Sequence, residues 1–215
     1  MTRLTKNNSI LLEAKSHGDY SYPDMLVGME KTHFNKDWYT QHLLLQAEGN
    51  QMLSIRQFVD FLTILKSGKA YYGSGKKVNS RVIQSTLNEI IQVRDPWRSE
   101  NLDAYFINNA SGTLKLNSHH QYDNGILTPK YSLPIGPCLM QDKTPGIDLQ
   151  DWLTNATEQG LPQSTTKSGK LYYWHPRNGA IARFSAGSDG VVLDCGRGPG
   201  GRCGSFGVRP SRKKI

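Results

Sequence analysis

The clearest hydrophobic pattern lies in LSIRQFVDFLTILKSG, residues 53–68. Ser54 followed three residues later by Gln57 is a capping box, which marks the first turn of a helix. Apolar residues then recur at helical spacing until Gly68, a typical helix-ending residue. The stretch therefore predicts an amphipathic helix whose buried stripe consists of Ile55, Phe58, Val59, Leu62 and Leu65.

Two further segments have the same period. The segment after GSGKKVN runs until Pro96 and has a core-facing stripe formed by Val82, Ile83, Leu87, Ile90 and Ile91. The segment DLQDWLTNATEQG begins with Asp148 as its expected N-cap and ends with Gly160. Its apolar face consists of Trp152, Leu153 and Ala156.

Elsewhere the pattern is typical of short strands separated by turns. Between the second and third helices, LDAYFIN, TLKLNSHHQY and ILTPKYSL are separated by the turns NASG and DNG. After the third helix, KLYYWH, AIARFSA and VVLDC are separated by RNG and SDG, and SFGVR follows a glycine-rich stretch. We therefore predict an α+β protein with N-terminal helices and a β-rich C-terminal half. Residues 1–20 lack a pattern and are expected to be loosely ordered.

Composition narrows the class of protein. The chain has 215 residues, of which 37% are hydrophobic and 20% charged, as expected for one globular domain over residues 21–215. No apolar run approaches the roughly 20 residues that span a bilayer, and the N-terminus does not resemble a signal peptide. We therefore expect no membrane insertion and a cytoplasmic location by default, with surface display requiring another route. The net charge of +8 favours weak attraction to polyanions.

Cysteines and histidines give no sign of a disulfide scaffold or a metal centre. Cys138, Cys195 and Cys203 are few and odd in number, which favours a reducing compartment. None of the histidines shows the spacing of zinc ligands, so no metal site is predicted. The adjacent His119 and His120 are expected in mid-strand, one exposed and one partly buried.

The glycine-rich stretch DCGRGPGGRCGSFG, residues 194–207, matches several nucleotide or RNA motifs only superficially. Gly196, Gly198 and Gly201 fit G-x-G-x-x-G, but no helical pattern follows that could hold a pyrophosphate. GRGPGGR resembles an arginine-glycine box, but it occurs once and between strands. Neither motif is therefore expected to bind nucleic acid specifically.

The composition of residues 185–206 has another possible cause. This stretch contains no Lys, Glu, Gln, Met or Trp, and each of its residues has a codon that ends in a pyrimidine. Replacing the two adenines of an asparagine codon yields Ser, Gly, Asp, Val, Arg or Cys, and never the absent residues. The stretch therefore looks like the product of mutagenesis at adenines.

The C-terminal region resembles the variable region of diversity-generating retroelement variable proteins, in particular the group from nanoarchaea and related archaea. The resemblance rests on YYW, ARF and SD, on Leu193, Cys195, Arg197 and Pro199, and on GVR, while HFNKDWYTQH, RDPWRSENLDA and DLQDWL also fit the group. It covers roughly residues 30–215. The ending FGVRPSR is also similar to the close of formylglycine-generating enzymes, which have a C-type lectin-like fold.

The resemblance implies a C-type lectin-like fold and a non-enzymatic, receptor-like protein that binds a variable ligand, expected to be a protein, without a cofactor. Residues 180–210 would form the variable region, mutated by an error-prone reverse transcriptase. The implied diversified positions are Ser185, Gly187, Asp189, Val192, Asp194, Gly196, Gly198, Gly201, Cys203 and Ser205, with Arg202 as a weaker candidate. The calcium and sugar chemistry of true lectins is not implied.

Strand alternation adds an expectation about side-chain direction. Even-numbered residues from Val192 to Gly198 should share one face, while Leu193, Cys195 and Arg197 should face the scaffold. Four aromatic residues of the scaffold are expected in the core rather than at the ligand: Tyr172, Tyr173, Trp174 and Phe184.

Two alternatives remain open. The first is an oxidase similar to formylglycine-generating enzymes, with Cys195 and Cys203 as a redox pair. The second is a polyanion-binding protein that uses basic residues near the C-terminus. The cations of this second alternative are Arg197, Arg202, Arg209, Arg212, Lys213 and Lys214.

Overall fold

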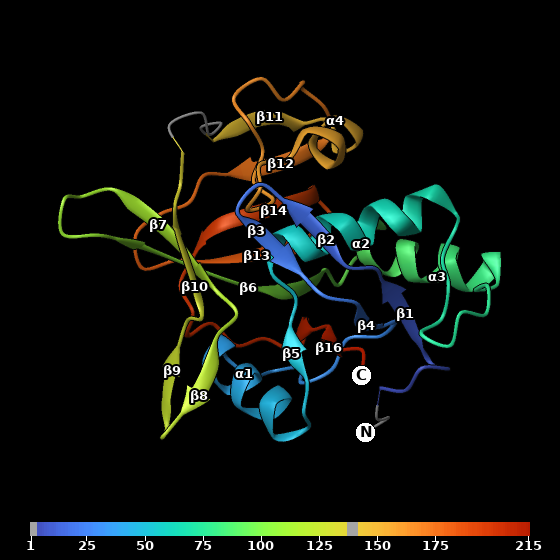
Figure 1. Cartoon of the computed structure of the whole chain (residues 1–215). Helices are drawn as coiled ribbons and strands as arrows, with labels where there is room; N and C mark the ends of the chain where they lie inside the picture. Colours follow the sequence, from blue (N-terminus) through green and yellow to red (C-terminus); the bar gives the residue numbers. More distant parts are fainter. Residues whose placement is uncertain (1–3, 137–141) are drawn as a thin grey trace.

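The computed structural model describes residues 4–136 and 142–215, and Cys138 lies outside these ranges. The described residues form four α-helices together with β-sheets, so the predicted α+β class is confirmed (Figure 1). The helices are α1 (Trp38–Ala47), α2 (Ile55–Ser67), α3 (Ser80–Ile91) and α4 (Leu149–Asn155). Within these ranges, no helix is long and apolar enough to cross a membrane.

An eight-stranded sheet carries most of the C-terminal half. Its strands are β6 (Arg98–Asn108), β7 (Leu114–Ser118), β10 (Tyr131–Pro134), β11 (Lys143–Ile147), β12 (Leu171–Trp174), β13 (Ile181–Gly187), β14 (Gly190–Arg197) and β15 (Phe206–Val208). The order is β10-β7-β6-β13-β14-β12-β11, and β15 pairs with β6. In Figure 1, β6, β13 and β14 cross the middle of the molecule. The segment predicted to be variable therefore lies between central strands of the sheet.

A second sheet joins the two ends of the chain. It contains β1 (Ser9–Leu12), β4 (Met25–Gly28), β16 (Pro210–Lys213) and β5 (Gln51–Met52), in the order β1-β4-β16-β5. Two-stranded ribbons are formed by β2 (Lys15–His17) with β3 (Tyr20–Tyr22), and by β8 (Gln121–Asp123) with β9 (Ile126–Thr128). Residues 1–20 were expected to be loose. Instead β1 pairs with β4 and buries Ile10 and Leu12, because their apolar side chains complete the core.

The helix α2 confirms its prediction in detail. Ser54 and Gln57 form the capping box, with the Gln57 N–H donating to Ser54 Oγ at 3.2 Å. Gly68 ends the helix in the left-handed conformation with φ +67°. The stripe packs on the eight-stranded sheet, where the Phe58 ring lies 5.0 Å from the Phe184 ring. Trp152 of α4 stacks on the same Phe184 ring at 6.2 Å, so α2 and α4 share one core.

The other helices agree with the sequence only in part. The start of α4 has the expected Asp148 cap, but Ala156 rather than Gly160 follows its last turn. Gly160 has φ +91°, and a Cβ there would lie 2.6 Å from the Arg56 nitrogen. Residue 160 must therefore be a glycine because the backbone of α2 comes so close, and not because α4 ends there. The helix α1, capped by Asp37, was not predicted.

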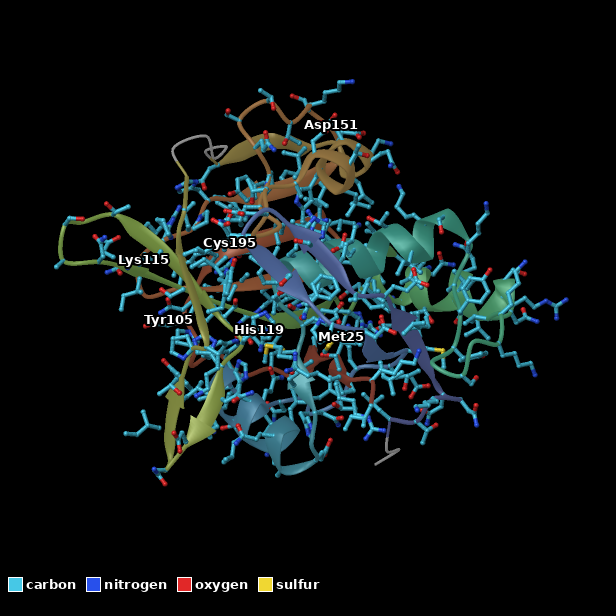
Figure 2. The ribbon with its side chains drawn as sticks, viewed as in Figure 1. Met25, Tyr105, Lys115, His119, Asp151 and Cys195 are labelled. Carbon is cyan, nitrogen blue, oxygen red and sulfur yellow. The ribbon has the colours of Figure 1, made fainter. Side chains whose placement is uncertain are left out.

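The predicted turns are present, but two of the expected strands are broken. TLKLNSHHQY is divided into β7 and β8, because His119 has φ +54°, and ILTPKYSL is divided into β9 and β10. His119 lies beyond the end of β7, as Figure 2 marks, so the histidines are not in mid-strand. The break turns His120 inward, where it is buried, while His119 is half-buried.

Candidate functional site

A pocket of about 640 Å³ lies over one face of β12, β13 and β14, and we call it the β14 pocket. Five of the ten predicted diversified positions line it: Ser185, Gly187, Asp189, Val192 and Asp194. The other lining residues are Asp95, Trp97, Tyr172, Trp174, Arg183, Ser188, Gly190, Arg197 and Phe206. Its volume falls within the range of roughly 300–1,000 Å³ that is common for ligand sites.

Strand pairing explains why these positions meet. Ser185 on β13 is directly opposite Val192 on β14, so their side chains share a face of the sheet. The alternate residues Leu193 and Cys195 are fully buried in the core on the opposite face. The expectation that Leu193 and Cys195 face the scaffold is therefore confirmed, and Figure 2 marks Cys195.

The expectation for Arg197 is wrong, and a β-bulge is the cause. Arg183 pairs with Asp194, but Ile181 pairs with Arg197, so β14 has one residue more than β13 between these pairs. An extra residue reverses the alternation that follows it. Arg197 consequently turns to the pocket, where its Nε donates to Asp194 Oδ2 at 2.6 Å.

Arg183 is the cation at the floor of the pocket. Its residue is 5% exposed, and its Nε donates to Asn101 Oδ1 at 2.7 Å. Its guanidinium carbon lies 4.1 Å from the centre of the Phe206 ring, but Nη2 has no hydrogen-bond partner. Burial lowers the pKa of Arg183 to about 10 although Asp194 raises it, so the group stays charged at neutral pH. A buried donor without a partner costs free energy that an acceptor placed beside it within the protein would recover.

Aromatic rings form the walls of the pocket. Trp97 and Trp174 are each 39% exposed, and the Trp97 ring lies 5.1 Å from the Phe206 ring. Tyr172 and Trp174 were expected in the core, and this expectation is wrong. Alternation along β12 buries Leu171 and Tyr173 and turns the other two rings to the pocket. The core expectation does hold for Tyr173 and Phe184.

The glycine-rich loop after β14 is attached to the start of α1. The Trp38 N–H donates to Pro199 O at 3.0 Å, and the Asn35 N–H donates to Cys203 O at 3.1 Å. Arg202 Nε donates to Asp37 Oδ2 at 2.9 Å. These contacts use mostly main-chain atoms of the loop, so they constrain its path without specifying most of its side chains.

The remaining five predicted positions differ in what surrounds them. A Cβ on Gly198 would meet nothing within 4 Å, whereas a Cβ on Gly201 would lie 3.5 Å from Arg183 Nη2. A Cβ on Gly196 would lie 3.5 Å from Arg177 Cδ. Cys203 is half-buried and Ser205 is buried. Gly201 is therefore the member of this group that reaches the pocket floor.

Gly187 lines the pocket mainly through its backbone. A Cβ at this position would lie 2.7 Å from Trp97 Cβ, so a side chain requires the backbone at one of the two residues to shift. Ser185 is also engaged, since its Oγ lies 2.9 Å from Ser99 Oγ. The sequence could not reveal either contact, because Trp97, which directly precedes β6, and Ser99, which lies on β6, are distant in the chain.

The oxidase alternative depends on the surroundings of Cys195 and Cys203. Both are free thiols, and Cys195 is fully buried in the core. Burial, followed by the negative charge of Asp194, raises the pKa of Cys195 well above its usual value. Since the thiolate is the reactive form, Cys195 is poorly suited to redox chemistry.

The basic residues of the polyanion alternative are mostly paired within the protein. Arg209 is 2% exposed and donates to Glu100 Oε2 at 3.0 Å. Three others each contact one carboxylate, in the pairs Arg197 with Asp194, Arg202 with Asp37 and Lys214 with Asp24. This cluster therefore offers less free positive charge than the sequence suggested.

Comparison of the chain with known proteins adds no relative. No protein-family model, no curated protein and no solved structure matches it. The function is therefore argued from the geometry of the β14 pocket.

Proposed function

We propose that the chain is a non-enzymatic, receptor-like protein that binds a variable ligand in the β14 pocket. Its fold would be of the C-type lectin-like type, and its residues 185–205 would be diversified by a retroelement. The observation that carries this proposal is the meeting of five predicted diversified positions at one pocket. They were chosen from the sequence without reference to any pocket, and they lie on β13, on β14 and in the turn between them.

The pocket also divides its residues in a way that suits variable recognition. Arg183, Phe206 and the exposed indoles are outside the predicted diversified set, and they would supply affinity for any ligand. The diversified positions surround them and would select among ligands. A pocket that combines constant residues with diversified positions around them would allow one scaffold to bind many different ligands.

The chemistry of the anchor indicates what the ligand presents. Arg183 and Arg197 place positive charge at the pocket, and a carboxylate or carbonyl oxygen would complement it. The aromatic walls favour an apolar or aromatic group next to that acceptor. An exposed protein segment with an acidic and an aromatic side chain has this combination, so we propose a protein ligand.

The decisive test of diversification is in the DNA around the gene. We expect a near-copy of the codons for residues 185–205, differing from the gene only where the copy has adenine, close to a reverse transcriptase gene. If the genome has no such copy, the retroelement part of the proposal fails.

Ligand binding is tested separately with a display library. Asparagine-type codons mutated at both adenines would be placed at predicted positions that have room for a side chain, namely Asp189, Val192 and Gly198, and a control library would place them at buried residues such as Leu193, Phe184 and Tyr173. We expect the first library to remain folded and to yield binders to a panel of unrelated proteins. A folded first library that yields no binders would contradict the binding role, whatever the DNA contains.

A further inference from the structure

A second cluster of polar residues lies in the interior, outside the β14 pocket. It consists of His42 on α1, Asp103 on β6 and His120, which lies between β7 and β8. All three are buried, and one ligand-type atom of each lies within 4.8 Å of the other two. No local sequence pattern indicates this cluster, because its members come from three distant segments.

One nitrogen of the cluster, His42 Nε2, lacks a hydrogen-bond partner. His42 is 3% exposed, and its Nε2 makes no hydrogen bond. The nearest Asp103 oxygen, Oδ1, lies 3.6 Å away, which is beyond hydrogen-bond distance. A buried nitrogen directed at a carboxylate without bonding to it is costly, and a shared cation would satisfy both groups.

The distances are close to those of a tetrahedral site. Metal bonds of about 2.0–2.1 Å place neighbouring ligand atoms roughly 3.3 Å apart. The separation of His42 Nε2 from Asp103 Oδ1, 3.6 Å, is near this value. His120 Nδ1 is 2.5 Å from the same oxygen, so binding would replace that hydrogen bond and move the two atoms apart by less than about 1 Å. His120 would then carry its proton on Nε2.

A pocket lies next to the cluster. Its volume is about 610 Å³, and it is lined by His42 and His120 together with Gln46, Gln51, Arg212 and Lys213, whereas Asp103 does not line it. Because His42 Nε2 is closed to solvent, a metal ion would reach the cluster only when these side chains move. The positive charges of Arg212 and Lys213 would weaken, but not prevent, binding of a dication.

We propose that His42, Asp103 and His120 bind a divalent transition metal ion, with zinc as the best fit. Two imidazole nitrogens and one carboxylate oxygen are typical zinc ligands, whereas calcium requires more oxygen ligands. The ion would fix α1 to the sheet. Since the start of α1 holds the glycine-rich loop through Trp38 and Asp37, the metal would also steady that loop.

The test uses the untagged full chain after removal of metals with a chelator. One equivalent of zinc chloride is added, free zinc is removed, and bound zinc is measured by mass spectrometry. We expect one zinc per chain for the wild type and for the control His175→Phe. For His42→Phe, which keeps a ring beside Trp38, we expect an affinity at least about 100-fold lower. Absence of stoichiometric zinc in the wild type, or equal binding by the variant, would overturn the proposal.

A measurement on the wild type alone guards against loss of folding in the variant. During a zinc titration followed by NMR, the ring signals of His42 and His120 should shift together and saturate at one equivalent. The signals of His175 and His17 should not move. A titration in which the His42 and His120 signals stay in place would reject the site without any mutation.

Discussion

The guanidinium of Arg183 lies over the ring of Phe206 with its carbon 4.1 Å from the ring centre. Arg183 belongs to β13 and Phe206 to β15, which follows the glycine-rich loop. The pair therefore joins the two ends of the predicted variable region beneath the β14 pocket. A cation on an aromatic face contributes roughly 0.5–2 kcal/mol and keeps the guanidinium in place.

The unpaired Nη2 of Arg183 allows a stabilising substitution. Gly201→Asp would place a carboxylate next to this atom, because a Cβ at Gly201 lies 3.5 Å from it. We expect the free energy of unfolding to rise by about 1 kcal/mol in low salt. Urea unfolding measures this change. Gly198→Asp is the control, since its surroundings are open, and an equal gain there would show that Arg183 is not the cause.

Substitution should change the free energy of unfolding much less at Gly198 than at Gly160. Gly198→Tyr places a side chain in open space, so we expect a change in the free energy of unfolding below about 0.5 kcal/mol. Gly160→Ala forces a Cβ against the α2 backbone at φ +91°, which we expect to cost more than about 2 kcal/mol. Thermal unfolding of both variants distinguishes the tolerant loop from the packed scaffold. Equal losses would contradict this distinction.

Thiol reactivity should separate the two described cysteines. In a Cys138→Ser background, half-buried Cys203 should react with a disulfide reagent in the folded protein. Cys195 should react at least about 100-fold more slowly, at a rate set by opening of the core, because it is fully buried with a raised pKa. Single variants Cys195→Ser and Cys203→Ser assign the two phases. Similar rates for both thiols would revive the redox alternative.

Asp60 should make stability depend on pH. It accepts hydrogen bonds from Arg56 Nη2 at 2.9 Å and Tyr22 Oη at 2.6 Å. Burial raises the pKa of Asp60, but Arg56 and the hydrogen bonds lower it more. The pKa of Asp60 in the folded protein is therefore below its usual value. The stabilisation is thus present above the usual value of about 4 and is lost as the pH falls further.

The substitution Asp60→Asn tests this relationship. At pH 7 we expect a loss of about 3–5 kcal/mol, because Arg56 would remain buried without its anion. As the pH falls below about 4 and through the lowered pKa of the folded state, the difference from the wild type should shrink, since Asp60 then becomes protonated in the folded chain as well. Exposed Asp19→Asn is the control. A difference that stays constant with pH would refute the role of the carboxylate.

Local signals in the sequence predicted three of the helices. The capping box at Ser54 and the periodic apolar residues of α2 and α3 were sufficient, because both helices bury an apolar stripe. The helix α1 was missed because its buried face includes Gln41 and His42. A helix that buries polar side chains leaves no hydrophobic period to detect.

The sequence predicted several residues of the candidate site, but it did not predict the shape of the pocket. Alternation along β14 correctly separated Val192 from Leu193, since one lies at the pocket and the other in the core. The bulge that turns Arg197 outward depends on pairing with Ile181, which no local pattern encodes. Likewise Trp97 reaches the pocket from the segment just before β6, and its contact with Gly187 arises only in the folded chain.

The position of β16 makes folding of its sheet depend on complete translation of the preceding residues. This strand lies between β4 and β5, and it follows every residue of the glycine-rich loop. A stop codon or frameshift anywhere in residues 185–205 would remove the sequence of β16. The edges of β4 and β5 that pair with β16 would then be exposed to solvent. The sheet that contains β1, β4 and β5 therefore receives its inner strand only from a chain whose glycine-rich loop was translated in the correct reading frame.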